Sequence, residues 1–457
     1  MGEKIDPKIF RAYDVRGLYP EELNEKTAFF IGQALVRFLK KKNPKILVSR
    51  DNRLSSKPLF NSLTKGILKK GGEIVDIGLS STPRFYFSVI KSLADAGIQI
   101  TASHNPSNYN GFKLVRKKAI PISGETGLKE IKEIIEKGDF NKRVFKKEKI
   151  IKKDFFKEYI DFNFKLAGFK NFENLKSFKV VVDTANAVSG IDLKALFKKL
   201  PCQVFHLFSE LDGSFPNHQP DPLLKENLKF LIREIKKRKA NLGIALDGDG
   251  DRVVFVDEKG KTIRGDFITA LIAKELLKEK PKEKILYEVR SSWIVRETIL
   301  KNNGIPILGR AGHSLIKEKM REKNILFAGE LSGHYFFREI GFFEGPLLVI
   351  LEMLKILVEE KKSLSEIIKP FEIYFQSGEI NFKVKDKEKK IEKIEKYYSK
   401  KAKKIIKIDG LTLEFNDWWF NLRPSNTEDL LRLNLEAKTK DILEKKTKEI
   451  TSLILKI

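Results

Sequence analysis

The chain has 457 residues, 41% of them hydrophobic, and a single cysteine. At roughly 100–200 residues per domain, this length predicts about three or four domains. One cysteine excludes a small module held together by disulfides and indicates a reducing compartment, the cytoplasm. No apolar stretch typical of a secretory signal follows Met1, and the longest apolar run falls well short of the roughly 20 residues of a membrane span. We therefore expect no membrane contact.

The net charge is +27, from 89 Lys and Arg against 62 Asp and Glu. Such an excess raises the alternative of a nucleic-acid-binding protein. However, the lysines are spread along the whole chain and alternate with glutamates, as in residues 274–284, and no cluster of arginines with interleaved aromatic residues is visible. The charge therefore predicts solvated helix faces, no nucleic-acid partner, and a weak preference for small anionic substrates at low salt.

One pattern recurs through the first two-thirds of the chain. A short, β-branched apolar run ends in a polar loop that contains Gly or Ser, and a helical segment follows. The runs lie at 45–51, 73–79, 96–106, 179–190, 241–252, 284–293, 305–314 and 325–334. Continuous apolar runs that alternate with amphipathic helices predict buried, largely parallel strands in α/β layers. Ligands bind beyond the carboxyl ends of such strands, so the loops after these runs are the candidate sites.

The boundaries between these units are less distinct. A charged, helical stretch at 142–162 could connect the first unit to the second, and a turn at 257–260 closes the second. A helix ends at Lys369 and Pro370, because proline disfavours helical backbone before it. Beyond it, 372–384 and 404–415 are typical of strands, the latter with a hairpin turn at Asp409 and Gly410.

We therefore predict three similar α/β domains and a smaller C-terminal α+β domain. The predicted boundaries are 1–150, 151–256, 257–370 and 371–457.

The first candidate loop, 101–113, contains Ser103 at the end of a strand, followed directly by His104. Neighbouring residues rarely face each other, and no G-x-S-x-G turn is present, so a hydrolase triad is disfavoured. The loop suits an exposed hydroxyl with Lys113 as a nearby cation. A simple turn rich in Asn, Pro and Gly is the alternative.

The second loop places Asp247, Asp249 and Asp251 at alternate positions after a buried strand. Carboxylates this close repel one another, and a hard divalent cation with oxygen ligands removes that cost. A calcium EF-hand loop is excluded, because Arg252 stands where the loop needs Gly and a strand follows. The pattern predicts a metal site, with Mg²⁺ as the expected ion and an acidic surface turn as the alternative.

The third loop, 329–334, offers Glu330 and Ser332 as acceptors for sugar hydroxyls and His334 as a group that exchanges protons near neutrality. A capped helix start is the alternative.

The fourth loop, 423–428, combines the forked guanidinium of Arg423 with the side chains of Ser425, Asn426 and Thr427. Beside backbone N–H groups that open a helix, these donors would form an anion cradle. A helix N-cap without a ligand is the alternative.

Taken together and in this order, the four loops resemble those of the α-D-phosphohexomutase family, and most closely its phosphomannomutase/phosphoglucomutase branch. Residues 10–17 (FRAYDVRG) resemble the family's N-terminal substrate-facing segment, and 309–320 (GRAGHSLIKEKM) resemble a loop that brings a histidine to the substrate. The resemblance covers essentially the whole chain. It implies three α/β domains with mixed, largely parallel sheets and a C-terminal α+β domain like the TATA-binding protein, arranged around a central cleft.

The resemblance also implies roles for single residues. Ser103 would carry the transferable phosphate, and Asp247, Asp249 and Asp251 would hold Mg²⁺ together with a phosphoryl oxygen on Ser103. Glu330 and Ser332 would bind the sugar O3 and O4 hydroxyls. The non-reacting phosphate would be bound by Arg423, Ser425, Asn426 and Thr427. The remaining cleft residues would be Tyr13, Arg16, His104, Lys113, Arg252, His313 and His334. Arg290 replaces the lysine common in the family, which leaves substrate preference at that position open.

By the same resemblance, the phosphate of Ser103 passes to a hexose phosphate of mannose or glucose. A hexose 1,6-bisphosphate intermediate, which also serves as activator, then turns and returns its other phosphate. His334 and Lys113 are the candidate acid and base, while His104 orients the phosphoserine. A monomer or weak homodimer is expected.

Two alternatives within enzyme chemistry remain open. One is a phosphoglucosamine mutase, which often carries Gln where this chain has Leu331. The other is a phosphatase with an aspartyl nucleophile in the second loop.

Overall fold

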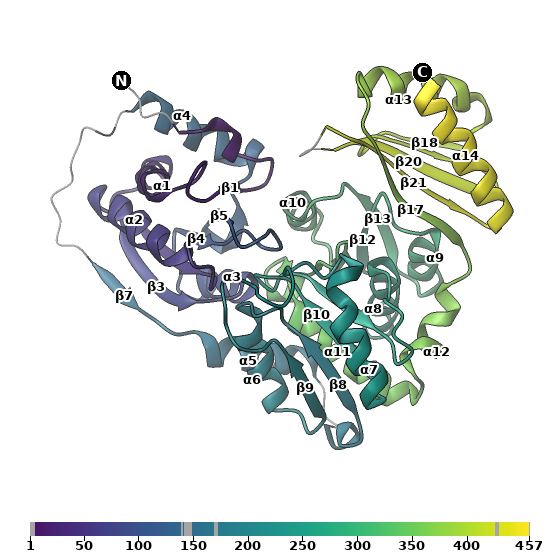
Figure 1. Ribbon diagram of the computed structural model, residues 1–457, viewed down its shortest axis with the longest axis horizontal. Coiled ribbons are helices and arrows are strands. Elements are labelled where there is room, and N and C mark those ends of the chain that lie inside the picture. The colour runs from purple at the N-terminus through teal and green to yellow at the C-terminus, as the bar shows by residue number, and fades with distance from the viewer. Residues whose placement is uncertain (1–4, 139, 141–148, 169–171, 426–428, 457) are drawn as a thin grey trace. The chain divides into compact units, whose positions relative to one another are not determined.

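The computed structural model describes residues 5–138, 140, 149–168, 172–425 and 429–456. The chain divides into two compact units: Met1–Ile263 with Ser332–Ser365, and Arg264–Leu331 with Glu366–Ile457 (Figure 1). Across these described ranges, no helix is long and apolar enough to cross a membrane.

The N-terminal part of the first unit is built on a seven-stranded mixed sheet with the order β1-β5-β4-β2-β3-β7 and with β6 paired to β5. The strands are β1 (Val15–Leu18), β2 (Lys45–Arg50), β3 (Glu73–Leu79), β4 (Ala96–Ile100), β5 (Tyr109–Arg116), β6 (Ile120–Pro121) and β7 (Ile150–Lys152). Strands β4, β2, β3 and β7 run parallel, whereas β5 runs antiparallel to β4 and β1. The β4–β5 connection therefore holds the first candidate loop at the carboxyl end of β4.

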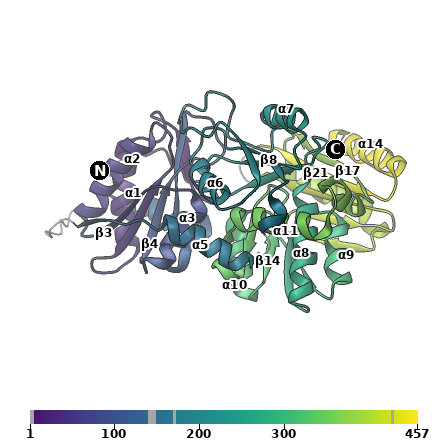
Figure 2. The same cartoon turned by 90° about the horizontal axis from the view of Figure 1, so that it is seen from below.

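Helices cover both faces of this sheet (Figure 2). Ile98 and Ile100 of β4 share one core with α1 (Glu25–Phe38), α2 (Ser56–Lys69) and α4 (Lys129–Lys137). Gly97, which points to the opposite face, lies directly under Phe85 and Val89 of α3 (Thr82–Lys91). The alternation along β4 thus places α3 on the other face, with its N-terminus directed toward the loops at the carboxyl edge.

The helix expected across 142–162 is wrong in part. Ile150–Lys152 form β7, which pairs with β3, and helix α5 begins only at Phe156 and ends at Ala167; residues 141–148 lie outside the described residues. Strand β7 adds to the sheet at the edge formed by β3. This backbone pairing outweighs the helical preference of the charged sequence around it. Helix α5 packs against α11 (Pro346–Glu360), the longest apolar run of the chain.

The second sheet of this unit has the order β11-β10-β8-β9. Its strands are β8 (Lys179–Asp183), β9 (Gln203–Leu207), β10 (Leu242–Leu246) and β11 (Val253–Val256), of which only β11 is antiparallel. Val181 and Ala245 share a core with Leu231 and Ile235 of α7 (Lys229–Arg238). Helix α6 (Ser189–Lys198) follows β8. The carboxylate loop fills the short connection between β10 and β11.

Two further predicted features are confirmed. A turn closes over 257–260, where the N–H of Gly260, at φ 82°, donates to the carbonyl of Asp257. Helix α12 (Leu364–Ile368) ends before Lys369 and Pro370, and these two residues continue in a short 3-10 helix that ends at Phe371. The first unit also contains the short hairpin of β15 (Tyr335–Phe337) and β16 (Phe343–Glu344).

In the second unit, β12 (Lys284–Glu288) lies between β13 (Ile305–Gly309) and β14 (Phe327–Gly329), and all three run parallel. Their helices are α8 (Gly265–Glu279), α9 (Trp293–Lys301) and α10 (His313–Lys323). Parallel strands that alternate with helices thus occur a third time, as the sequence predicts.

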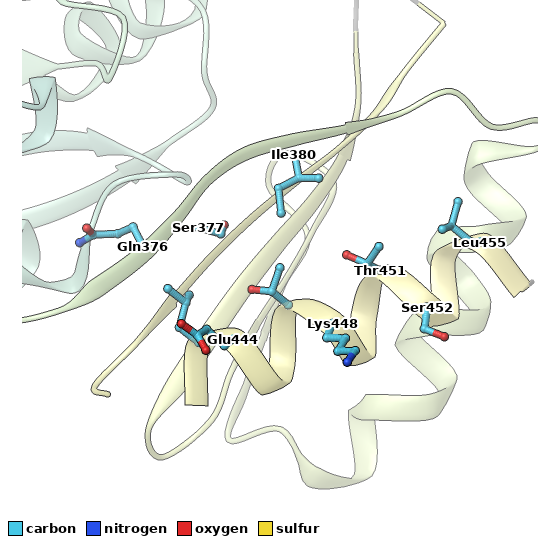
Figure 3. Close-up of a pocket in the computed structure, with 10 residues that line it drawn as sticks. Gln376, Ser377, Ile380, Glu444, Lys448, Thr451, Ser452 and Leu455 are labelled. Atoms are coloured by element: carbon cyan, nitrogen blue, oxygen red, sulfur yellow. The ribbon is translucent and has the colours of Figure 1, made fainter. Parts of the chain in front are cut away.

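The C-terminal part of the second unit is an antiparallel sheet with the order β17-β21-β20-β19-β18. Its elements are β17 (Phe375–Phe382), α13 (Lys387–Tyr398), β18 (Lys404–Ile406), β19 (Leu411–Glu414), β20 (Trp418–Pro424), β21 (Leu431–Ala437) and α14 (Lys440–Lys456). Side chains from both helices enter one core with the sheet, among them Ile394 and Ile450. A groove of about 690 Å³ lies between β17 and α14 and is lined by Ser377, Ile380 and Thr451, among others (Figure 3). No predicted site residue lines it.

Candidate active site

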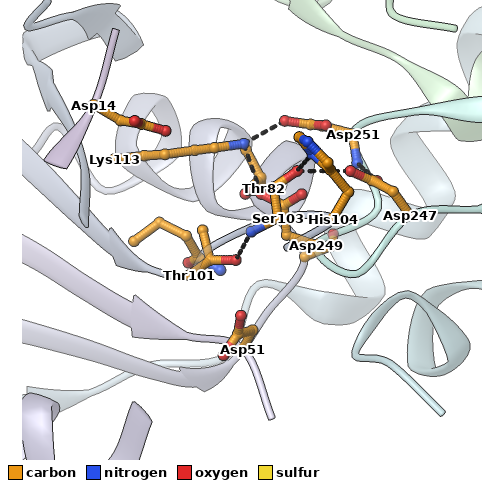
Figure 4. Close-up of polar contacts among 12 residues, drawn as sticks. Asp14, Asp51, Thr82, Thr101, Ser103, His104, Lys113, Asp247, Asp249 and Asp251 are labelled. Carbon is orange, nitrogen blue, oxygen red and sulfur yellow. Dashed lines mark hydrogen bonds and ion pairs between the residues drawn. The ribbon is translucent and has the colours of Figure 1, made fainter. Parts of the chain in front are cut away.

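Ser103 lies in a backbone conformation that turns its hydroxyl toward the carboxylate loop. Its φ is 52°, in the left-handed region, and its N–H donates to Thr101 Oγ1 over 2.9 Å. The hydroxyl donates to Asp247 Oδ2 over 2.8 Å and lies 3.2 Å from His104 Nδ1 (Figure 4). The expectation that adjacent Ser103 and His104 do not face each other is therefore wrong, because the left-handed turn rotates both side chains to one side.

Arg53 holds the backbone of this loop and is not among the predicted site residues. Its side chain is buried and both terminal nitrogens donate to main-chain carbonyls at 2.5–3.1 Å. The acceptors belong to Ser103, Asn105, Pro106 and Tyr109. Asp51 Oδ2 lies 3.2 Å from the remaining guanidinium nitrogen. Nothing in the sequence distinguishes this arginine from its neighbours, since its partners are carbonyls that are about fifty residues away.

The three carboxylates converge as the sequence predicts. Asp247, Asp249 and Asp251 are buried, and each offers an oxygen within 4.8 Å of the others. Gly250, at φ 69°, allows the tight turn between β10 and β11. Burial and the charges of Asp251 and Asp249 raise the pKa of Asp247 well above its usual range. Such repulsion is what a divalent cation relieves.

Lys113 lies among these carboxylates. Its Nζ is 2.6 Å from Asp249 Oδ2 and also contacts Asp251 Oδ2 (Figure 4). Burial alone would lower the pKa of Lys113, but the two carboxylates raise it well above its usual range. The ammonium is therefore held in its charged form, which suits charge compensation better than proton abstraction.

Thr82, at the N-terminus of α3, fixes Asp249. Its N–H donates to the Asp249 carbonyl over 2.8 Å and its hydroxyl donates to Asp249 Oδ2 over 2.5 Å. The other oxygen, Asp249 Oδ1, is buried and has no hydrogen-bond partner among the residues that the structure describes. An oriented carboxylate with one unsatisfied oxygen, beside two further carboxylates, fits a divalent metal ion.

His334 joins the same cluster from the third loop. Its Nε2 lies 3.2 Å from Asp251 Oδ1, and its Nδ1 lies 2.8 Å from the hydroxyl of Ser332. Glu344, at the end of β16, also has an oxygen within 4.8 Å of these ligand atoms and is fully buried. Glu344 is not among the predicted site residues, because one acidic residue after two phenylalanines forms no recognisable motif.

The other predicted residues of the first unit are Arg252, Arg16 and Tyr13. Arg252 Nε is 3.9 Å from Asp247 Oδ2. Arg16, on β1, donates to Asn105 of the Ser103 loop over 2.6 Å and to Asp14 over 2.5 Å. Tyr13 is half-buried in the segment that precedes β1.

In the second unit, Glu330 and the histidine loop are linked. Glu330 is buried, and its Oε1 accepts the N–H of Gly312 over 2.7 Å. His313 follows as the first residue of α10, and its Nδ1 lies 3.4 Å from Lys317 Nζ. The structure thus brings the predicted sugar-binding carboxylate beside the backbone that carries His313.

Arg290 and Arg423 also meet in this unit. Arg290 is held by Glu288 at 2.7 and 2.8 Å, and its Nη1 reaches Glu379 Oε2 at 3.4 Å. Arg423 Nη2 lies 3.3 Å from the same oxygen, and Arg432 Nη1 lies 3.2 Å from Glu379 Oε1. Neither Glu379 nor Arg432 belongs to a predicted site, because they come from separate strands, β17 and β21, that only the fold brings together.

The helix expected after the fourth loop is wrong. Arg423 lies near the end of β20, and the chain enters β21 at Leu431; these strands pair antiparallel with Arg423 opposite Arg432. The apolar residues at alternate positions of 431–437 have strand period, which overrides the polar cap signal before them. Ser425 is described and its N–H donates to the Leu430 carbonyl, whereas Asn426 and Thr427 lie outside the described residues.

A serine hydroxyl lies beside three carboxylates in the first unit, and three guanidinium side chains gather around one carboxylate in the second unit. Groups of these kinds are typical of enzymes of phosphoryl transfer. Sequence profiles of four domains match the chain in order. They are phosphoglucomutase/phosphomannomutase α/β/α domain I at 7–142, domain II at 156–260, domain III at 264–374 and the C-terminal domain at 379–453. The chain therefore belongs to the phosphoglucomutase/phosphomannomutase family, the α-D-phosphohexomutases.

Individual relatives agree. The chain is 44% identical to a phosphomannomutase of Methanocaldococcus jannaschii, over 99% of this chain and 98% of the relative. It is 37% identical to a phosphomannomutase of Escherichia coli K12, over 97% and 98% of the two chains. A crystal structure of a phosphoglucomutase/phosphomannomutase family protein from Burkholderia thailandensis superposes with a TM-score of 0.89 at 31% identity, covering 99% of this chain and 98% of the other.

These matches confirm the predicted family and the predicted architecture of three α/β domains and a C-terminal domain. They also confirm the predicted enzyme class, an isomerase that moves a phosphate within hexose phosphates.

Proposed function

We propose that this enzyme interconverts hexose 1-phosphates and hexose 6-phosphates through phosphorylated Ser103 and a hexose 1,6-bisphosphate. The single observation that carries the proposal is the Ser103 hydroxyl, 2.8 Å from Asp247 within a buried three-carboxylate cluster. We propose mannose phosphates as the preferred substrates and glucose phosphates as the second pair. The names of the relatives from M. jannaschii and E. coli support mannose.

In the first half-reaction, the bond between phosphorus and Ser103 Oγ breaks while a bond from phosphorus to a sugar hydroxyl forms. The hydroxyl proton passes to a base, and Ser103 Oγ takes up a proton when it leaves as the alcohol. The second half-reaction reverses these steps on the other phosphate of the bisphosphate. Among our candidates we assign the proton transfer on the sugar to His334, since the raised pKa of Lys113 opposes its loss of a proton. His104, whose Nδ1 faces Ser103 Oγ, orients the phosphoserine.

We propose Mg²⁺ as the resident metal, held by Asp247, Asp249 and Asp251. When bound, the ion would neutralise part of the charge on the transferring phosphoryl group. The protein groups prepare for this role: Thr82 orients Asp249, and the ammonium of Lys113 offsets the remaining negative charge.

We assign Arg423 with Ser425, Asn426 and Thr427 to the non-transferring phosphate, Arg290 and His313 to its surroundings, and Glu330 with Ser332 to sugar hydroxyls. Tyr13, Arg16 and Arg252 complete the set of proposed substrate contacts. The domain boundaries 1–150, 151–256, 257–370 and 371–457 and a cytoplasmic monomer or weak homodimer are part of the same proposal.

The test is turnover of mannose, glucose and glucosamine 1-phosphates by the wild type and by Ser103→Ala. Ser107→Ala, in an exposed position of the same loop, is the matched control. We expect the wild type and Ser107→Ala to turn over mannose and glucose 1-phosphates and to carry one covalent phosphate by intact-mass analysis. Ser103→Ala should lose both the turnover and the phosphate. Faster turnover of glucosamine 1-phosphate would favour the phosphoglucosamine mutase, and an active Ser103→Ala enzyme would point to an aspartyl nucleophile.

A further inference from the structure

One carboxylate, that of Glu379, lies among three guanidinium groups in the second unit. Its Oε2 is 3.3 Å from Arg423 Nη2 and 3.4 Å from Arg290 Nη1, and its Oε1 is 3.2 Å from Arg432 Nη1. Glu379 belongs to β17, next to a bulge that shifts the pairing with β21 between Gln376 and Glu379. The carboxylate thus occupies an anion position beside Arg423, the guanidinium that we assign to the non-transferring phosphate.

The strand register places two arginines opposite each other, so an anion between them stabilises the sheet. Arg423 and Arg432 are directly opposite each other on β20 and β21, and like charges in opposite positions destabilise a sheet unless a counter-charge lies between them. Burial and the nearby charge of Arg290 lower the pKa of Arg423, in keeping with crowded positive charge. Arg423 is only 5% exposed, and its Nε has no hydrogen-bond acceptor within the described ranges.

Glu379 is held loosely compared with the other carboxylate in this cluster. Glu288 binds Arg290 at 2.7 and 2.8 Å and is fully buried, which is typical of a fixed, charge-assisted pair. The three contacts of Glu379 are 3.2–3.4 Å long, and its side chain is 26% exposed. Glu288 is therefore a fixed partner of Arg290, whereas Glu379 can be replaced by an anion that arrives from solvent.

We propose that Glu379 is an internal competitor for the phosphate that Arg423 binds, so that phosphate binding at this cluster is an exchange of one anion for another. The inference rests on the proposed function and deepens it. A phosphate dianion has more charge and more acceptor oxygens than a carboxylate, so it displaces Glu379, but its net affinity is reduced by the contacts that Glu379 gives up.

This exchange suits a reaction with two half-reactions. The bisphosphate must release its bound phosphate before it turns and presents the other one. A carboxylate that re-enters the guanidinium cluster stabilises the vacated state, so it accelerates release and keeps ground-state binding modest. Glu379 is thus a residue that sets affinity and takes no part in the bond changes.

The test is Glu379→Gln, which keeps the size of the side chain and removes its charge. Binding of inorganic phosphate and of mannose 6-phosphate is measured by calorimetry on the full-length protein at low salt. We expect both ligands to bind on the order of tenfold more tightly, with a matching fall in KM and no rise in kcat. Glu392→Gln, which removes an exposed carboxylate from the same domain, is the control and leaves both constants unchanged.

Unchanged or weaker phosphate binding by Glu379→Gln overturns the exchange. Arg423→Lys separates this failure from failure of the proposed function. If Arg423→Lys weakens phosphate binding while Glu379→Gln has no effect, the phosphate site stands and the competition is refuted. If neither variant changes binding, the phosphate assignment itself fails. Should Glu379→Gln not fold, Glu379→Asp serves instead: its shorter side chain withdraws the carboxylate, and tighter phosphate binding is again the expected result.

Discussion

At the scale of single residues, the site is governed by the need to hold several carboxylates close together. Lys113 and His334 contact the outer oxygens of Asp249 and Asp251, and Ser103 donates to Asp247. Each of these contacts orients a carboxylate, and the ammonium of Lys113 also offsets the charge of Asp249 and Asp251. The groups that orient the ligands therefore control how well a metal ion binds, in addition to the ligands themselves.

Thr82→Val should weaken metal binding without removing a ligand. The change deletes the hydroxyl that donates to Asp249 Oδ2 and keeps the shape of the side chain. Loss of such an orienting contact typically costs about 10–100-fold in metal affinity. We expect the Mg²⁺ concentration for half-maximal activity to rise by at least about tenfold, with activity recovered at high Mg²⁺.

Thr64→Val, which removes a buried hydroxyl bonded to its own helix, is the control. Loss of activity that excess Mg²⁺ cannot restore would contradict a role of the Thr82 hydroxyl in metal binding.

Arg53→Lys should slow turnover more than it changes substrate binding. Lysine keeps the charge but has one nitrogen in place of the planar fork, so it cannot donate to four carbonyls at once. The Ser103 loop would lose its fixed position. We expect kcat to fall by about 10–100-fold with a smaller change in KM, because the Ser103 hydroxyl would no longer be aligned with the bound substrate.

Arg116→Lys, a half-buried arginine of the same domain that stacks on Phe38, is the matched comparison. An Arg53→Lys enzyme with normal kcat would show that the loop holds its shape without the fork.

At the scale of elements, most strands were predictable from the sequence and two segments were not. The run at 73–79 coincides with β3, because its residues Ile74, Val75 and Ile77 favour extended backbone and the strand pairs along β2. The helices expected near 150 and after Glu428 were wrong, because an open sheet edge and a partner strand decided those segments. The residues of the candidate site also divide into those with a local sequence pattern and those whose partners are distant in the sequence. The spacing of Asp247, Asp249 and Asp251 is local and was readable, whereas Arg53 and Glu379 act on partners that only the fold brings near.

Gly97→Ala tests how closely α3 packs on the first sheet. An added Cβ would lie 2.6 Å from Val89 and 2.8 Å from the ring of Phe85. Overpacking of this kind costs roughly 1–3 kcal/mol, which exceeds the roughly 0.5–1 kcal/mol that alanine gains over glycine inside a strand. Urea unfolding should therefore show a net loss of stability. The double variant Gly97→Ala with Val89→Ala should lose less than the sum of the single losses, and strict additivity would contradict the predicted clash.

His218 should make stability depend on pH. Its Nε2 lies 3.1 Å from both oxygens of Asp183 at the end of β8, and its Nδ1 lies 2.9 Å from the carbonyl of Gln219. Both partners only accept, so both contacts are hydrogen bonds only in the doubly protonated ring. Burial lowers the pKa of His218, but the bond to Asp183 outweighs it and the net shift is upward.

Because the folded pKa is raised above the unfolded value of about 6.5, this stabilisation is fully present below that value and is lost as pH rises through the folded pKa. We expect the difference in unfolding free energy between the wild type and His218→Gln to shrink from pH 6 toward pH 8, roughly the range around that value. A difference that is constant across this range would show that His218 is not protonated in the fold.

At the scale of the whole molecule, the net charge of +27 comes from lysines that are spread along the whole chain. Exposed lysines pair with acidic residues one helical turn away, as in Lys137 with Glu133 and Lys440 with Glu444. Such pairs contribute little to stability, so the many lysines are not explained by folding. Their summed field acts on any anionic ligand that approaches, and phosphosugars are anions.

The field should appear as a salt dependence of substrate capture. Between about 0.01 M and about 0.15 M ionic strength, the Debye length falls from about 30 Å to about 8 Å, which screens the distributed charge from a substrate in solution. We expect kcat/KM for mannose 1-phosphate to fall several-fold over this range while kcat changes little, because attraction acts before the substrate is bound. Anions that bind guanidinium groups would mimic the effect by competition, so the series is repeated with a second salt of larger, weakly bound anions at equal ionic strength. Equal falls in kcat/KM with both salts identify screening. A kcat/KM that stays constant in the second series would show that the fall in the first came from competition at the arginine cluster, with no long-range steering by the net charge.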